Sequence, residues 1–184
     1  MRSRSVVAAG AVALLAPAGC ARPAPPDEDP LPPVQLVQQP AASAGGACIL
    51  WNYPFIKQKI GITFEVAASG QADDTSTCVV QTIAGNWPDL ALSVVESTTA
   101  GAGTFSDLVP AKAVRLKGLG KAAYRLDLPA SGGHGPVVEI GWLSEAKQLQ
   151  TLRFTFAKGA KAAEVKAMRT KLLSLAKAMD TTAG

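Results

Sequence analysis

The chain has 184 residues, which is enough for one domain or two small ones, and its formal net charge is +4 at pH 7. The charge is unevenly distributed, since residues 20–100 carry an acidic excess and residues 101–184 a basic one. The longest apolar run is well short of the roughly 20 residues that cross a bilayer, which argues against a membrane-spanning helix in the mature protein.

Residues 1–19 have the layout of a secretory signal peptide. Arg2 and Arg4 form a basic start, residues 6–16 form an apolar run, and small residues follow. This order of basic, apolar and small residues is typical of a segment that is removed during export. We therefore exclude residues 1–19 from the fold.

The signal segment ends in PAGC, which resembles the lipobox of bacterial lipoproteins, where the cysteine is acylated and becomes the mature N-terminus. Ala18 and Gly19 fit this pattern, whereas Pro17 stands where leucine is usual. Cleavage after Ala18 is the alternative, and it leaves Cys20 as a free thiol on a secreted protein. We favour Cys20 as the lipid attachment site, which predicts a lipid-anchored protein on the extracytoplasmic face of the cell membrane.

Residues 20–46 are predicted to form a loose tether between the lipidated cysteine and a folded domain. Residues 21–46 contain seven prolines, the acidic run Asp27–Asp29 and a stretch of small residues. Such a composition buries too little apolar surface to offset the entropy lost on ordering. The folded part is therefore expected to be a single domain over residues 47–184.

The remaining cysteines, Cys48 and Cys78, form a pair once Cys20 is acylated. In an exported protein the default for such a pair is a disulfide. A zinc site is the alternative, but the chain lacks the additional cysteine and histidine ligands that zinc requires. Export also makes nucleic acid a poor fit to the basic second half, which suits anionic lipid or wall polymers better.

Short apolar–polar patterns in the folded part predict a mainly antiparallel sheet. A helical region over residues 48–61 comes first and starts afresh at Pro54. A polar loop is expected over residues 70–77 and a flexible connection over residues 98–104. The strands are predicted over residues 62–67, 78–84, 89–97, 111–116, 122–128, 137–143 and 149–157.

The clearest element is an amphipathic helix over residues 164–179, which contains no glycine or proline. Its apolar residues recur with helical spacing and fall on one stripe: Val165, Met168, Leu172, Leu175, Ala176 and Met179. The predicted fold class is therefore α+β, with a short disulfide-linked N-terminal helix and a C-terminal helix packed on the sheet.

His134 is the candidate catalytic residue, because it is the chain's one histidine and lies in the glycine-rich loop SGGHGP. Nucleophilic hydrolysis would pair it with a serine such as Ser131 or Ser144 and an orienting acid. The chain has no G-x-S-x-G elbow. A solvated loop histidine is the favoured interpretation, and a small hydrolase is the alternative.

Two further motifs match binding sites only in part. GLGKAA (residues 118–123) fits a dinucleotide fingerprint, but a strand pattern follows it where a phosphate-binding helix is needed, so we expect a tight turn. Asp73 and Asp74 lack the spaced oxygen ligands of a calcium loop. The sequence thus predicts no metal and no cofactor.

Other charged and aromatic side chains are expected to be structural or solvated. The basic residues of the last helix, Lys166, Arg169, Lys171 and Lys177, are spread over its polar side, which favours a solvated face. Trp87, in the turn GNWP, is expected to cap the core, with recognition as the alternative.

The pattern resembles a family of small actinobacterial cell-envelope lipoproteins that is grouped as domain of unknown function 3558. The matching features are Cys20, Cys48, Gly61, Cys78, GLGKAAY (residues 118–124) and the helix through Met179. The departures are Pro17 and the segment CVVQ, where an aromatic residue often follows the second cysteine. The resemblance implies an envelope location and a disulfide, and it assigns no catalytic residues.

The sequence as a whole predicts a membrane-anchored, non-enzymatic binding or accessory module. Its expected partner is an envelope protein, a polymer or a small apolar ligand, in addition to the membrane that holds the lipid anchor. A small secreted hydrolase using His134 and a structural envelope protein without a ligand are the alternatives.

Overall fold

The structure of the protein is a computed structural model that describes residues 38–96 and 99–180. The expected signal peptide, Cys20 and the first part of the tether lie outside the described residues. Within these two ranges, no helix is long and apolar enough to cross a membrane.

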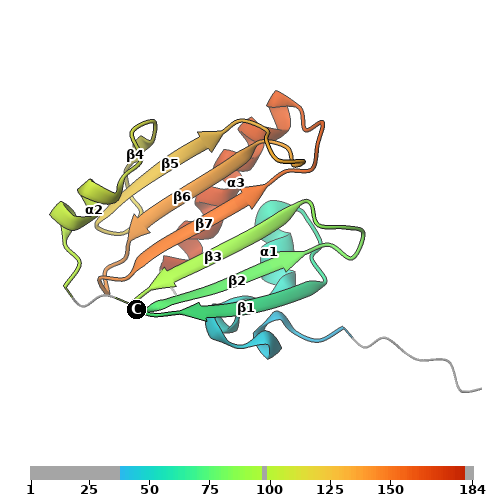
Figure 1. Ribbon diagram of the computed structural model, residues 1–184, viewed down its shortest axis with the longest axis horizontal. Helices are drawn as coiled ribbons and strands as arrows, with labels where there is room; N and C mark the ends of the chain where they lie inside the picture. Colours follow the sequence, from blue (N-terminus) through green and yellow to red (C-terminus); the bar gives the residue numbers. More distant parts are fainter. Residues whose placement is uncertain (1–37, 97–98, 181–184) are drawn as a thin grey trace, which may run out of the picture. The chain divides into compact units, whose positions relative to one another are not determined.

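Within the described residues, seven antiparallel strands form one sheet in the order β1-β2-β3-β7-β6-β5-β4 (Figure 1). The central pair joins β3 to β7, with Leu92 opposite Leu152, so it connects two meanders that are far apart in the sequence. The strands are β1 (Val66–Ala72), β2 (Thr75–Gln81), β3 (Asp89–Val95), β4 (Val114–Leu116), β5 (Ala122–Leu128), β6 (Val137–Leu143) and β7 (Leu149–Thr155).

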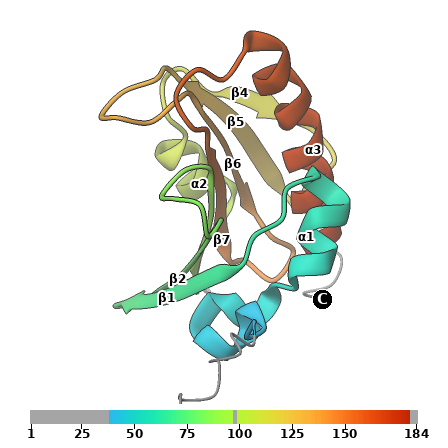
Figure 2. The same cartoon turned by 90° about the vertical axis from the view of Figure 1, so that its right-hand side faces the viewer.

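The two longer helices lie side by side on one face of the sheet (Figure 2). The Asn52 side chain caps the first of them by accepting a hydrogen bond from the Phe55 amide, and Gly61 ends it in a left-handed conformation with φ 80°. The helical elements of the described chain are η1 (Ala41–Ala44), η2 (Gly46–Leu50), α1 (Tyr53–Ile60), α2 (Ala102–Leu108) and α3 (Ala162–Asp180).

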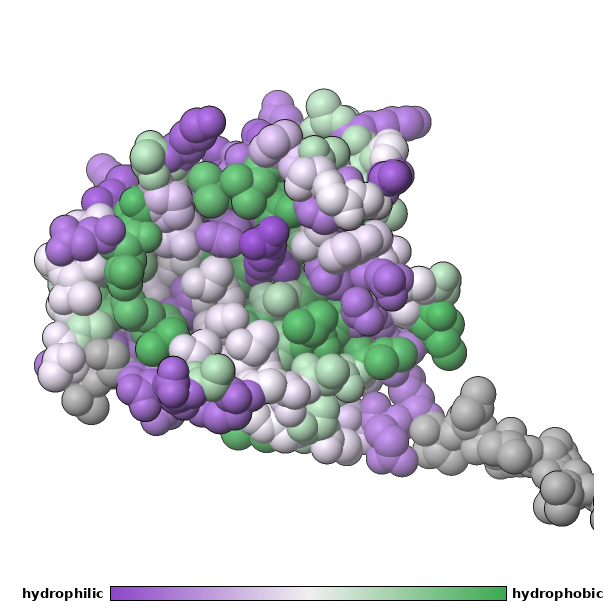
Figure 3. All heavy atoms as spheres, in the orientation of Figure 1, coloured by the Kyte–Doolittle hydropathy of each residue, from purple (hydrophilic) through white to green (hydrophobic). Residues whose placement is uncertain are grey.

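Among residues 38–96 and 99–180, only one end of the opposite face of the sheet is covered. Helix α2 packs there, where Phe105 lies against Tyr124 with ring centroids 5.9 Å apart. Figure 3 views this face, which is largely pale or green over the strands, with hydrophilic residues near its middle and at its edges. The sheet therefore has one face packed by helices and one mostly open face.

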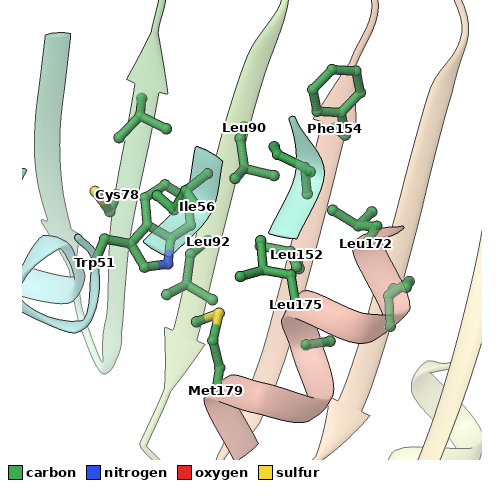
Figure 4. Packing of buried hydrophobic residues seen from close by; sticks show 14 of the residues in the cluster. Trp51, Ile56, Cys78, Leu90, Leu92, Leu152, Phe154, Leu172, Leu175 and Met179 are labelled. Atoms are coloured by element: carbon green, nitrogen blue, oxygen red, sulfur yellow. The ribbon is translucent and has the colours of Figure 1, made fainter. Parts of the chain in front are cut away.

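The main core lies between the sheet and helices α1 and α3 (Figure 4). Leu90, Leu92 and Leu152 project from the sheet toward Leu172 and Leu175 of α3. All six residues of the predicted helical stripe are buried, which confirms the stripe. Burial of one apolar face is what holds α3 on the sheet.

Cys48 and Cys78 form a disulfide, as the sequence predicted. The bond joins η2 to the inner face of β2 across 30 residues, and both cysteines are fully buried. It thus fastens the N-terminal helical segment to the sheet. The α+β fold class, with the disulfide and the C-terminal helix on the sheet, is also as predicted.

The folded domain includes residues before the expected boundary at residue 47. Residues 41–44 form η1, and Ala41 is buried. The Ser69 hydroxyl donates a hydrogen bond to the Ala44 carbonyl, and the Ala47 amide donates one to Ser76 Oγ. These small residues pack closely beneath β1 and β2, so the last part of the expected tether belongs to the domain.

Three local predictions were wrong in their boundaries. Strand β1 begins at Val66 instead of residue 62, and the expected loop over residues 70–77 is mostly strand around a turn at Asp73 and Asp74. Helix α2 occupies part of the expected connection over residues 98–104. Phe105 is the one buried residue of α2 and holds it against the sheet. A helix with a single buried residue shows no repeating apolar pattern in the sequence, so the pattern did not predict it.

Candidate functional site on the open face of the sheet

Small residues form the middle of the open face. The strand pairing places Gly70, Thr77, Ser93, Thr151 and Gly141 in one row across five strands. The hydroxyl oxygens of Thr77 and Ser93 lie 3.3 Å apart, within hydrogen-bonding distance. Small and hydroxylated side chains let another molecule approach the sheet closely, so the part of the row from Gly70 to Thr151 is suited to contact.

A polar network begins where Tyr124 crosses the open face. Its ring lies over Gly141, where any Cβ would collide with the ring. Its hydroxyl donates a hydrogen bond of 2.9 Å to Glu139 Oε1. Burial and the adjacent Glu139 charge raise the pKa of Tyr124 far above its usual range, so the phenol stays a protonated donor.

Glu139 and Arg153 lie opposite each other on β6 and β7 and continue the network. The distance from Glu139 Oε2 to Arg153 Nη1 is 3.9 Å, which is a loose ion pair. The Glu139 side chain is 13% exposed, while the Arg153 side chain is 43% exposed. The carboxylate is therefore held beneath the surface, and the guanidinium is reachable from the open side.

Asp89 lies opposite Thr155, in the row of paired residues next to the one that contains Arg153 and Glu139. Its Oδ1 is buried and has no hydrogen-bond partner within the described part of the chain. Burial raises the pKa of Asp89, while Thr155 and the charges of Arg153 and His134 lower it. Asp89 is thus a half-buried carboxylate whose surroundings do not fully compensate its charge.

His134 and Trp87 stand at the same end of the face as Asp89. Their ring centroids are 5.2 Å apart, with the planes inclined by 58°. His134 Nδ1 lies 2.6 Å from the Gly135 carbonyl oxygen, so Nδ1 donates a hydrogen bond to it. Trp87 belongs to neither apolar cluster, so it does not cap the core as expected.

The structure brings together only one of the serine–histidine pairs considered for hydrolysis. Ser131 Oγ lies 3.5 Å from His134 Nε2, which exceeds the reach of about 2.6–3.2 Å that is typical of a working base. A backbone carbonyl, and no carboxylate, orients the ring. Ser144 is elsewhere, where its buried hydroxyl accepts a hydrogen bond from the Gln148 amide.

The GLGKAA motif is a turn between β4 and β5, as predicted, and a strand follows it. Gly118 and Gly120 adopt positive φ values of 71° and 49°. Asp73 and Asp74 form the hairpin turn between β1 and β2. Residues 38–96 and 99–180 contain no group of three side chains suited to holding a metal ion.

Two cations of α3 bind the rest of the domain, which the prediction of a solvated face missed. Arg169 Nε donates a hydrogen bond of 2.9 Å to Asp127 Oδ1. Lys171 Nζ donates one of 3.1 Å to the carbonyl of Ile60, at the end of α1. These contacts join α3 to β5 and α1.

Sequence reasoning did not identify Tyr124, Asp89, Glu139 or Arg153 as a site. The available signal was a single charge within an apolar strand, as in VVEIGWL and LQTLRFT. Single charges of this kind are common on solvent-exposed strand faces, so the pattern alone did not distinguish residues of a binding site from ordinary surface residues. Their proximity depends on the pairing of β3, β7 and β6.

No protein-family model, curated protein or solved structure matches this chain. The resemblance to the envelope lipoprotein family stays a prediction. The site is therefore interpreted from its own geometry, which combines an uncovered sheet face, a row of small residues and a partly buried set of charges.

Proposed function

We propose that the protein is a lipid-anchored, non-enzymatic binding module on the extracytoplasmic face of the cell membrane. Cys20 carries the anchor, and the open face of the sheet is the binding surface. The observation that carries this proposal is the partly buried polar network of Tyr124, Glu139 and Arg153, with Asp89 in the next row. It lies on a sheet face that no helix of the described residues covers along most of its width.

The open face differs from an ordinary solvated sheet face. In an antiparallel sheet with one solvent-exposed face, that face usually carries polar side chains that extend into water. Here the Glu139 side chain is only 13% exposed, and Val137, two residues before it on the same face of β6, is fully buried. Ionisable groups held partly out of water are characteristic of binding and catalytic sites.

Binding fits these groups better than catalysis does. The raised pKa of Tyr124 makes its phenol a poor proton donor to a reacting group, and Glu139 is engaged by both Tyr124 and Arg153. The Ser131–His134 pair is too long and lacks an orienting acid. Hydrolysis using His134 is the alternative, and it predicts that His134→Ala abolishes turnover of a test ester such as p-nitrophenyl acetate.

Site-specific photo-cross-linking in the intact envelope tests the binding surface. A photoreactive p-benzoylphenylalanine replaces Ala91, which lies opposite Arg153 on the open face, or Lys166, which is exposed on α3. We expect a discrete adduct from position 91 and none from position 166. Adducts that form equally at both positions, or at neither, would contradict the assignment of the open face.

A further inference from the structure

We propose that the protein assembles head to tail with further copies of itself, with a basic edge of one copy docked in an acidic groove of the next. The acidic groove combines apolar and acidic side chains, which are Ile49, Leu50, Asp73, Asp74 and Glu96. The basic edge combines apolar and cationic side chains, which are Leu108, Lys112, Val114, Arg115 and Lys117. This contact uses none of the residues assigned to the binding site on the open face, so it goes beyond the function proposed for that face.

Exposed large apolar side chains mark the two surfaces. In the described chain these side chains are Ile49, Leu50, Val66, Ile83, Leu108 and Val114. The first two belong to the acidic groove, and the last two belong to the basic edge. Single exposed apolar residues are ordinary, whereas apolar residues gathered together and bordered by charges mark sites of interaction between proteins.

The acidic groove is a hollow of about 560 Å³ between η2, the turn that joins β1 to β2, and the end of β3. Its lining residues in the described chain include three acids and no lysine, arginine or histidine. Asp73, Asp74 and Glu96 are exposed, and among residues 38–96 and 99–180 no cationic side chain lies within 4.0 Å of their carboxylates. The groove thus offers apolar contact next to negative charge that no nearby cation compensates.

The basic edge is formed by the end of α2, the turn after it and the edge strand β4. The Arg115 guanidinium donates a hydrogen bond of 3.3 Å to Ser106 Oγ, which holds β4 beside α2. Lys112 and Lys117 flank β4 and are exposed, as is Arg115, and Asp107 is the one acid of this segment. Cations therefore exceed acids at this edge, beside two exposed apolar side chains.

A second copy supplies what each surface lacks. Opposite charges then flank a shared apolar contact, which is the arrangement that steers two protein surfaces together and fixes their register. Strand β4 forms one edge of the sheet and β1 forms the other, with β2 beside it, so a copy cannot place its own basic edge in its own groove (Figure 1). Because both halves of the contact are present on one chain, the occupant of the groove is a further copy. A contact between two different surfaces extends into a row or closes into a ring.

Photo-cross-linking between two differently tagged copies of the full chain, expressed in the same cells, tests this proposal. The first copy carries p-benzoylphenylalanine in place of Ile49, in the groove. We expect an adduct that has the mass of two chains, contains both tags, and maps by mass spectrometry to residues 108–117 of the second copy. The photoreactive group in place of Ile83, which is exposed outside both surfaces, should give no such adduct.

Lys112→Glu in the second copy should lower the yield of this adduct about tenfold, because it places a like charge against the groove. Asp74→Lys in the second copy is the control, and it should leave the yield unchanged, since that copy contributes its edge and not its groove. The Lys112→Glu chain should still form the adduct when it carries the photoreactive group at position 49 itself, which also shows that this variant is folded.

Three results would each overturn head-to-tail assembly. The first is the absence of a two-chain adduct from position 49, including the case in which this position captures only a different protein. The second is an undiminished yield with the Lys112→Glu second copy. The third is an equal loss of yield from Asp74→Lys and Lys112→Glu, which would show that the two copies do not use different surfaces.

Discussion

At the scale of single residues, Asp89 is the side chain that fits the fold least well. It lies on a central strand with one carboxylate oxygen buried and unpaired in the described chain. The next residue, Leu90, is fully buried in the core, whereas Asp89 points to the other face and is only half-buried. A residue that costs stability and faces an open surface is better explained by binding than by structure.

Asp89→Asn is expected to stabilise the protein at neutral pH. Burial raises the pKa of Asp89 above its unfolded value, so the folded state favours the protonated form. The corresponding stability is present below the unfolded pKa and is lost as the pH rises through the folded pKa. Asparagine cannot ionise, so we expect the variant to be more stable than the parent at pH 7, by a small amount because water screens the half-exposed Asp89 charge.

Urea unfolding at pH 7 and pH 3 measures this effect. The difference in the free energy of unfolding between the Asp89→Asn variant and the parent protein should shrink at pH 3, where Asp89 is protonated in both states. A variant that is less stable than the parent at pH 7 would show that the carboxylate supports the fold, and our assignment would be wrong.

At the scale of elements, the turn between β4 and β5 depends on close backbone packing. Gly120 has a φ of 49°, and a Cβ there would collide with the carbonyl of Leu143 at the end of β6. The Lys121 amide donates a hydrogen bond of 2.8 Å to that same carbonyl. Backbone contact therefore fastens the turn between β4 and β5 to the end of β6.

Gly120→Ala is expected to lower the free energy of unfolding by about 2 kcal/mol, because it adds both a steric clash and a strained backbone conformation. Gly103→Ala is the matched control. Gly103 lies in α2 with open space where its Cβ would point, so the same change there should be neutral or stabilising by up to about 1 kcal/mol. Equal effects in thermal or urea unfolding would contradict this account of the turn.

At the scale of the whole molecule, the proposed function requires that the domain stay at the membrane. The described residues include no helix that could cross a bilayer. The proposal places the anchor at Cys20 because the segment PAGC resembles a lipobox. Stable anchoring needs more than one acyl chain, and the lipoprotein pathway that acts on such cysteines attaches several.

Cys20→Ala is expected to release the protein from the membrane. Without the thiol, no acyl chain can be attached, and the domain should move from the detergent-rich phase to the aqueous phase in Triton X-114 partitioning. Cys48→Ser provides a comparison, since it removes a different cysteine and should leave the partitioning unchanged. A Cys20→Ala protein that stays with the membrane would show that the anchor lies elsewhere.

Much of the fold could be predicted from the sequence because its signals are local. Six apolar residues at helical spacing predicted α3, and alternating patterns predicted β5, β6 and β7 within two residues. Cysteine counting predicted the disulfide between Cys48 and Cys78. Each inference used a short segment or the composition of the chain. Helical and strand periodicity arise from backbone geometry over a few residues, so a short segment is enough to reveal them.

The candidate site was decided only by the tertiary structure. Pairing of β3 with β7 places Asp89 opposite Thr155, and pairing of β7 with β6 places Arg153 opposite Glu139. The folding of residues 41–46 and of helix α2 likewise depends on contacts with distant strands. The order of strands in a sheet depends on contacts between distant segments, and the pattern along one strand does not encode it. The sequence by itself therefore determined which face of each helix and strand is buried. Only the tertiary structure decided that Asp89, Glu139 and Arg153 lie on neighbouring strands.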